Sequence, residues 1–328
     1  MRLQFLYIAF AIISICQNSY GQESNEDLAI FNKGNALFNL IYEDLDIDYE
    51  MYQLDTTQLE GKIRYKILNN HKEEILERSL EYYEELIDNY PKSELLYRAI
   101  NNAALISEKL DYYDEAIGYY ETILRSKADD SEKGGVGSGL MGEPYALYKN
   151  RACKSLASIY IKQKDYKKAL KYIKLTKKYP YQHFCGNEYA ADDIYISNLY
   201  TICYAELNDI KTALKYALPH LFYNGLASND SILKTIIETL KKNYSKEELL
   251  KELNNSLASI KIKSRKGNEY GYLLFLGVEV EIPDGLHYFD NTNGQLDEDK
   301  LSKLSDLEKY KFYYKASSFY NQITNYVN

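Results

Sequence analysis

The stretch Gly137-Ser-Gly139-Leu-Met-Gly142 has the glycine spacing of a dinucleotide-binding turn. In such a site the glycines let the backbone approach a pyrophosphate at the start of a helix that follows a β-strand. Here the preceding residues have the apolar spacing of a helix, so the strand that would position the turn is missing. The sequence therefore favours a mobile surface loop at this place and predicts no nucleotide cofactor.

Metal ligands are also poorly placed. The four histidines stand at positions 71, 183, 220 and 287, and no two of them share a helix at ligand spacing. His183 and Cys185 supply two ligands, whereas a structural zinc ion needs four. Asp290-Asn-Thr-Asn-Gly294-Gln looks like a calcium loop, but its alignment puts Phe289 and Lys300 where carboxylates are required. We expect no metal ion.

No serine–histidine arrangement and no carboxylate pair in distinct environments is recognisable, so we expect a protein without enzymatic activity. An isolated acidic residue can still be catalytic, and an enzyme site in the C-terminal part stays open as an alternative. The net charge of −8 argues against nucleic acid as a partner.

A repeated pattern dominates the elements around these residues. Leu110-Asp-Tyr-Tyr-Asp-Glu-Ala-Ile-Gly-Tyr-Tyr-Glu-Thr-Ile-Leu124 recurs, altered, in 163–173 and 207–217, and more faintly in 77–87. Each copy predicts a tight turn followed by a helix. A small residue occupies the position where that helix contacts its predecessor: Ser79, Ala116, Ala169 and Ala213.

These helix pairs resemble tetratricopeptide repeats. The best match has Leu156, Ala157 and Tyr160 on one helix, Tyr166 and Ala169 on the next, and Pro180 at the end. The similarity covers residues 57–220, although the tryptophan of the family pattern is absent and the repeat lengths vary. It implies an all-α (mainly) fold, a tetratricopeptide-like helical-hairpin solenoid.

The resemblance also implies a binding groove. In this family the first helix of each pair lines a concave face that binds an extended peptide or a partner helix. The residues predicted to face this groove are Arg98, Asn101, Leu105, Arg151, Lys154, Tyr195 and Asn198. Their cationic and amide groups could hold an acidic segment or a C-terminal carboxylate by charge-assisted hydrogen bonds, unless they are simply solvated helix positions.

Residues 1–21 have the features of a secretory signal peptide. Arg2 precedes an apolar run from Leu3 to Ile15, and Ser19 and Gly21 offer a cleavage site before Gln22. We expect an exported protein, periplasmic or secreted, with association with the cell envelope as an option. Lipidation of Cys16 is disfavoured because Ile15 precedes it. The remaining cysteines, 153, 185 and 203, permit one disulfide bond but do not require it.

The predicted organisation continues with an N-terminal helical segment (22–56) and a repeat array (57–228) with a glycine-rich insertion at 128–144. We expect residues 45–56 to be a connection, a helix break at 69–71, and a loop as far as Ala190. The C-terminal part (229–328) predicts two helices, a small C-terminal β-hairpin or meander, and one capping helix as far as Tyr326. Lys261 and Lys263 should pair with Glu279 and Glu281 across neighbouring strands.

The sequence thus predicts an exported scaffold or adaptor that binds a protein or peptide in a concave groove. Two alternatives remain besides the enzyme: an envelope lipoprotein of the outer-membrane-assembly type, and a glycan-binding accessory protein whose tyrosines stack on sugars. Tyrosine is abundant, with 36 residues and no tryptophan. The oligomeric state cannot be derived from the sequence.

Overall fold

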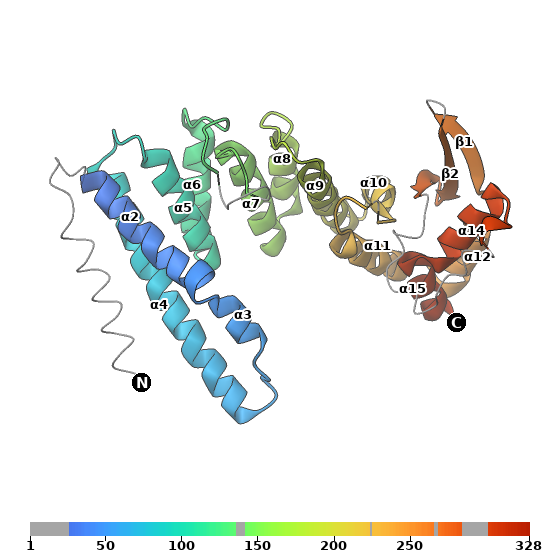
Figure 1. The fold of residues 1–328 in the computed structure, drawn as a ribbon, viewed down its shortest axis with the longest axis horizontal. Helices are drawn as coiled ribbons and strands as arrows, with labels where there is room; N and C mark the ends of the chain where they lie inside the picture. Colours follow the sequence, from blue (N-terminus) through green and yellow to red (C-terminus); the bar gives the residue numbers. More distant parts are fainter. Residues whose placement is uncertain (1–25, 136–141, 224, 266–267, 284–300) are drawn as a thin grey trace. The chain divides into compact units, whose positions relative to one another are not determined.

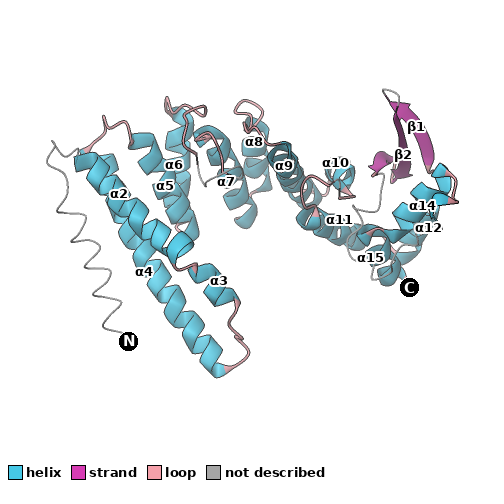
Figure 2. Ribbon diagram, in the orientation of Figure 1, coloured by secondary structure: helices cyan, strands magenta, loops and turns pink. Residues whose placement is uncertain are grey.

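The computed structural model describes residues 26–135, 142–223, 225–265, 268–283 and 301–328. The chain forms two compact units, Met1–Ser126 and Lys127–Asn328. Both are mainly helical, and the second contains a small antiparallel sheet (Figure 2). The predicted signal peptide, the core of the glycine-rich insertion and the calcium-like loop lie outside the described residues.

The first unit contains two helix pairs. Its elements are α2 (Glu26–Asn39), the π-helix η1 (Leu40–Asp44), α3 (Ile47–Tyr52), α4 (Leu59–Asn89), α5 (Leu96–Lys109) and α6 (Tyr113–Arg125). Helix α2 packs along α4, α4 against α5, and α5 against α6 (Figure 1). The segment before residue 57 is thus packed onto the first predicted repeat helix.

Two predictions for this unit are wrong. The expected connection at 45–56 contains α3, because the Asp46 side chain caps its first turn and Ile47 and Met51 are buried. The expected break at 69–71 is absent, and α4 runs through it. No proline or glycine stands there, and the Asn69 amide, which could compete with the backbone, instead donates a 2.6 Å hydrogen bond to the Glu73 carboxylate.

The second unit begins with two more helix pairs and ends with a sheet and further helices. Its elements are α7 (Tyr148–Lys162), α8 (Tyr166–Leu175), α9 (Gly186–Glu206), α10 (Ile210–Ala217), the 3₁₀-helix η3 (Leu218–His220), α11 (Asp230–Asn243), α12 (Lys246–Ala258), β1 (Lys261–Arg265), β2 (Asn268–Phe275), β3 (Val278–Ile282), α14 (Asp306–Ala316) and α15 (Ser318–Val327). Helix α9 starts before Ala190, so the expected loop is shorter than predicted.

The turns inside the predicted helix pairs share one backbone geometry. Asp111, Lys164 and Asn208 have φ angles of 60°, 60° and 61°. In each turn the next residue's N–H donates a 2.8 Å hydrogen bond to the carbonyl oxygen five residues earlier. The small residues Ser79, Ala116, Ala169 and Ala213 are all fully buried. The repeated helical-hairpin prediction is therefore confirmed.

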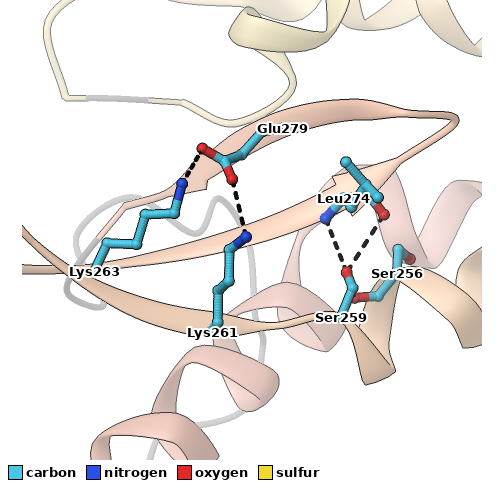
Figure 3. Close-up of polar contacts among 6 residues, drawn as sticks. All are labelled: Ser256, Ser259, Lys261, Lys263, Leu274 and Glu279. Carbon is cyan, nitrogen blue, oxygen red and sulfur yellow. Dashed lines mark hydrogen bonds and ion pairs between the residues drawn. The ribbon is translucent and has the colours of Figure 1, made fainter.

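The C-terminal sheet is a meander in the order β1-β2-β3. Lys261 and Lys263 both form ion pairs with Glu279, but across the middle strand and not with a neighbouring one (Figure 3). The expectation of neighbouring strands is wrong because a turn at Leu276 and Gly277 divides residues 268–282 into β2 and β3, and β2 lies between the lysines and Glu279. The two φ values of 48° and 79° identify a tight hairpin turn.

The opposite face of the sheet is buried against helices. Leu273, Phe275, Val280 and Ile282 belong to a core shared with α11, α12, α14 and α15. At Gly271 the ring of Tyr310 packs directly on the backbone, where a Cβ atom would lie 2.3 Å from the ring. Glycine is therefore required for this contact between the sheet and α14.

The predicted final helix is divided into α14 and α15 at Ser317. The Ser317 hydroxyl donates to the Tyr314 carbonyl at 2.7 Å and accepts from the Tyr320 N–H at 3.2 Å, so it ends one helix and caps the next. Capping boxes begin two of the C-terminal helices, at Ser245 for α12 and at Ser305 for α14. No helix in the described ranges is long and apolar enough to cross a bilayer.

Candidate functional site

The predicted groove residues fall into two sets, one in each unit. Arg98, Asn101 and Leu105 follow one another at helical spacing on α5 in the first unit. Asn101 is buried, and its amide donates to the Asn102 carboxamide oxygen at 3.3 Å. Arg98 and Leu105 are half-buried. These three residues form a shallow, partly polar strip on the first helix of its pair.

The second set lies on α7 and α9, which contact each other. Lys154 of α7 forms an ion pair with Asp192 of α9, and both side chains are largely buried, with exposures of 16% and 19%. The Lys154 ammonium also lies 4.5 Å from the centroid of the Tyr181 ring. One cation thus connects the first helices of two consecutive pairs.

The environment of this pair shifts the acid–base properties of its members. Burial lowers the pKa of Lys154, and the Asp192 carboxylate opposes that shift. Burial, reinforced by the carboxylates of Glu188 and Asp192, raises the pKa of Tyr181 to about 12. The Tyr181 phenol beside the Lys154–Asp192 pair is therefore neutral near pH 7.

Arg151, one turn before Lys154, forms an ion pair with Glu143, with side-chain exposures of 20% and 27%. Glu143 belongs to the described end of the glycine-rich insertion. Sequence analysis missed Glu143 and Asp192, because nothing in the local pattern indicates which loop or helix supplies the counter-charge.

Backbone contacts fix the described ends of the insertion on α7. The Ala146 N–H donates to the Glu132 carbonyl at 2.8 Å, and Lys133 forms a bridge with Tyr145. The Asp130 carboxylate accepts from the N–H groups of Lys149 and Asn150 at 2.6 and 3.1 Å. These N–H groups belong to the first turn of α7, so Asp130 caps the helix that carries Arg151.

His183 also contacts the described end of the glycine-rich insertion, at Gly142. Its Nδ1 accepts from the Cys185 N–H at 2.9 Å, which leaves the proton on Nε2 to donate to the Gly142 carbonyl at 3.0 Å. The ring is buried and stacks on Tyr181 at 6.1 Å. These contacts give His183 a structural role in placing the residue before Glu143.

Tyr195 and Asn198 follow Asp192 on α9. Tyr195 is 41% exposed. The Asn198 side-chain oxygen is shielded from solvent, yet it accepts no hydrogen bond from the part of the chain that the structure describes. A buried acceptor without a donor costs free energy, which a ligand N–H or a bound water would recover.

Other chemistry is sparsely represented in the described residues. No group of three or more histidine, cysteine or acidic side chains among them could hold a metal ion. The three cysteines in these ranges are free thiols, and burial raises the pKa of Cys153 and Cys203 to about 12, far from a reactive thiolate.

A depression of about 450 Å³ lies where the sheet meets α14, lined by Asn268, Glu269, Tyr270, Asp306, Lys309 and Tyr310. Because this depression could hold a small molecule, the alternative of an enzyme site in the C-terminal part stays open.

Comparison with known families agrees with the helical pairs. Residues 99–134 and 152–180 match the family model described as tetratricopeptide repeat. These two segments are similar to tetratricopeptide repeats. The matched segments include most of the α5/α6 and α7/α8 pairs, and α9/α10 has the same turn geometry outside them. No curated protein matches the chain significantly. Tetratricopeptide repeats in general form protein-interaction scaffolds that bind proteins or peptides and are typically not enzymes.

Proposed function

We propose that this protein is an exported scaffold that binds an acidic peptide segment or a C-terminal carboxylate on the first helices of its repeats. The Lys154–Asp192 ion pair is the observation on which this proposal rests. It places a partly desolvated cation between two consecutive first helices, where a bound peptide would contact both.

Three features of the α7–α9 surface support an extended peptide as the ligand. Arg151 and Lys154 provide two cations one helical turn apart, each already in a geometry that accepts a carboxylate. The Asn198 oxygen is buried without a donor in the described residues, so the side chain would gain a hydrogen bond by turning outward to a peptide N–H. Tyr195 adds an exposed aromatic ring of the kind that is enriched at protein interfaces.

The proposed export depends on the sequence of residues 1–22, whose charge, apolar run and small residues fit a signal peptide. Mass spectrometry of the mature N-terminus tests it. A chain that begins at Gln22 supports export as a non-lipidated protein. An acylated Cys16 would favour the envelope lipoprotein, and an intact Met1 would refute processing.

Affinity capture from the native cells tests the binding site. Wild-type chain should recover a partner that the Arg151→Gln/Lys154→Gln variant recovers poorly, because the cations are lost. Asn198→Ala leaves both ion pairs in place and should also weaken recovery. The matched control is Lys167→Gln/Lys174→Gln, which removes the same charge from exposed positions on α8.

Circular dichroism of each variant checks that its fold is retained. Equal recovery of the partner by folded wild-type and site variants would refute the proposed site. Binding of the partner's C-terminal peptide as a free acid, compared with the same peptide as an amide, separates a terminal carboxylate from an internal acidic segment.

A further inference from the structure

The first half of α4 is exposed on all sides over nearly two turns. Every residue from Lys62 to Ile67 is exposed, although the second half of the same helix carries the buried contacts of the first unit. Figure 1 shows this half extending beyond α2 and α5, with α3 beside it. It is anchored at Gly61, where a Cβ atom would lie 2.0 Å from the Asp55 carbonyl oxygen.

Three large aliphatic side chains form a ridge on this exposed half. Leu59, Ile63 and Ile67 are 74%, 52% and 41% exposed. With 3.6 residues per turn, their spacing of four places them on one side of α4, opposite the buried Ser79 and Tyr83. The ridge therefore does not contribute to the packing of the first unit. Exposed apolar surface of this kind marks interaction sites.

The positively charged side chains beside the ridge are likewise exposed. Lys62, Arg64 and Lys66 have no ion-pair partner in the described part of the chain. Further along the helix, Lys72 pairs with Asp48 and Arg78 with Glu81. Against the one carboxylate of Glu60, these three cations give residues 59–67 a positive local charge, opposite to the net charge of −8 of the whole chain.

The shape of the ridge favours a helix over a lipid surface. A row of side chains at a spacing of four is what packs into the groove of another helix. A helix that lies in a membrane interface needs a broad apolar face, whereas here charged residues flank a narrow row on both sides. A second copy of the chain is also disfavoured, because antiparallel ridges would bring Lys62 and Lys66 against the same lysines.

We infer that the first three turns of α4 dock an amphipathic α-helix of a partner protein, with acidic residues beside its apolar stripe. The apolar ridge supplies the buried contact, and the three cations select the acidic partner. This site lies in the first unit and is independent of the binding site proposed on α7 and α9.

Site-specific photo-cross-linking of the full chain in its native cells tests the inference. A benzophenone amino acid at position 63 should cross-link to a helical, acidic segment of another protein. The same group at position 85, also exposed on α4, is the matched control and should not. Lys62→Glu/Lys66→Glu should lower the yield at position 63 by about tenfold or more, since the charges then repel.

Cross-links from position 63 to lipid, to a second copy of the chain, to a segment without acidic residues, or to nothing would each overturn the inference. A yield that the double charge reversal leaves unchanged would also overturn it. Because the side chains of Lys62, Ile63 and Lys66 are exposed, the variants should retain the fold, and circular dichroism verifies this. The two sites are distinguished if the Arg151→Gln/Lys154→Gln variant loses its partner in affinity capture but still cross-links from position 63.

Discussion

The Ser79 hydroxyl donates a 2.8 Å hydrogen bond to the carbonyl oxygen of Gly34, in a contact where both residues are buried. It connects α4 to α2, so α2 is the helix that the small residue of the first repeat copy contacts. The first predicted repeat thus has its partner helix upstream of residue 57, inside the segment that sequence analysis had assigned to a separate N-terminal region.

Enlarging this contact should destabilise the first unit. Ser79→Leu introduces three more carbon atoms where α2 and α4 touch and removes the hydrogen bond, which should cost about 1–3 kcal/mol or more. Hydrogen exchange of residues 26–126 in the full chain measures the loss. Glu85→Leu, an exposed position on the same helix, is the control. Equal exchange in the two variants would show that α2 does not depend on this contact.

Tyr83 should make the first unit sensitive to alkaline pH. Burial raises its pKa to about 12. Above pH 10 the unfolded tyrosine loses its proton while the folded one keeps it, so the free energy of unfolding falls as pH rises towards 12. With a pKa of about 12 in the folded state and 10.0 in the unfolded state, the loss at pH 11 is about 1.4 kcal/mol.

Tyr83→Phe removes this titration, so the destabilisation that it causes near pH 8 should shrink by about 1.4 kcal/mol at pH 11. Urea denaturation at the two pH values measures the difference. Tyr52→Phe, at a position that is 83% exposed, controls for the other tyrosines and should show no such change. A pH-independent effect of Tyr83→Phe would contradict the assignment.

Local sequence signals predicted the elements that depend on near neighbours. The repeated turn and helix have their physical cause within a few residues, and their small residues Ser79, Ala116, Ala169 and Ala213 are buried as expected. The misplaced elements depend on distant contacts or on a single side chain. Helix α3 is short and needs α4 to bury Ile47, and the division at Ser317 depends on one hydroxyl.

The same distinction applies to the candidate site. Sequence analysis selected Arg151 and Lys154 by helical position, but their counter-charges come from a loop and from the next helix pair. Glu143 and Asp192 could not be chosen among 48 acidic residues without the packing of α7 against α9. The residues that sequence analysis missed are therefore those whose role depends on contacts between separate elements of the fold.

Gly271 should be intolerant of any side chain. Gly271→Ala places a methyl group within 2.3–2.7 Å of three atoms of the Tyr310 ring, so the sheet or α14 must shift, at a cost of about 1–3 kcal/mol or more. Thermal denaturation of the full chain measures this effect. Gly186→Ala, with nothing within 4 Å of the new atom, is the matched control in the same unit and should be neutral.

Glu143 should compete with an acidic partner for Arg151. Glu143→Gln keeps the size of the side chain but removes its charge, so the Arg151 guanidinium becomes available to an incoming carboxylate. We expect tighter binding of the partner recovered by affinity capture, by about tenfold if the released ion pair is worth about 1.4 kcal/mol. Isothermal titration calorimetry measures the change.

Arg151→Gln should have the opposite effect, and Glu132→Gln, earlier in the same insertion, is the charge-matched control. The competition is specific to Arg151, so the gain from Glu143→Gln should disappear in the Glu143→Gln/Arg151→Gln double variant. If the gain persists without Arg151, it comes from the lower net charge of the protein, and Glu143 is then a structural residue of the insertion and not an internal competitor.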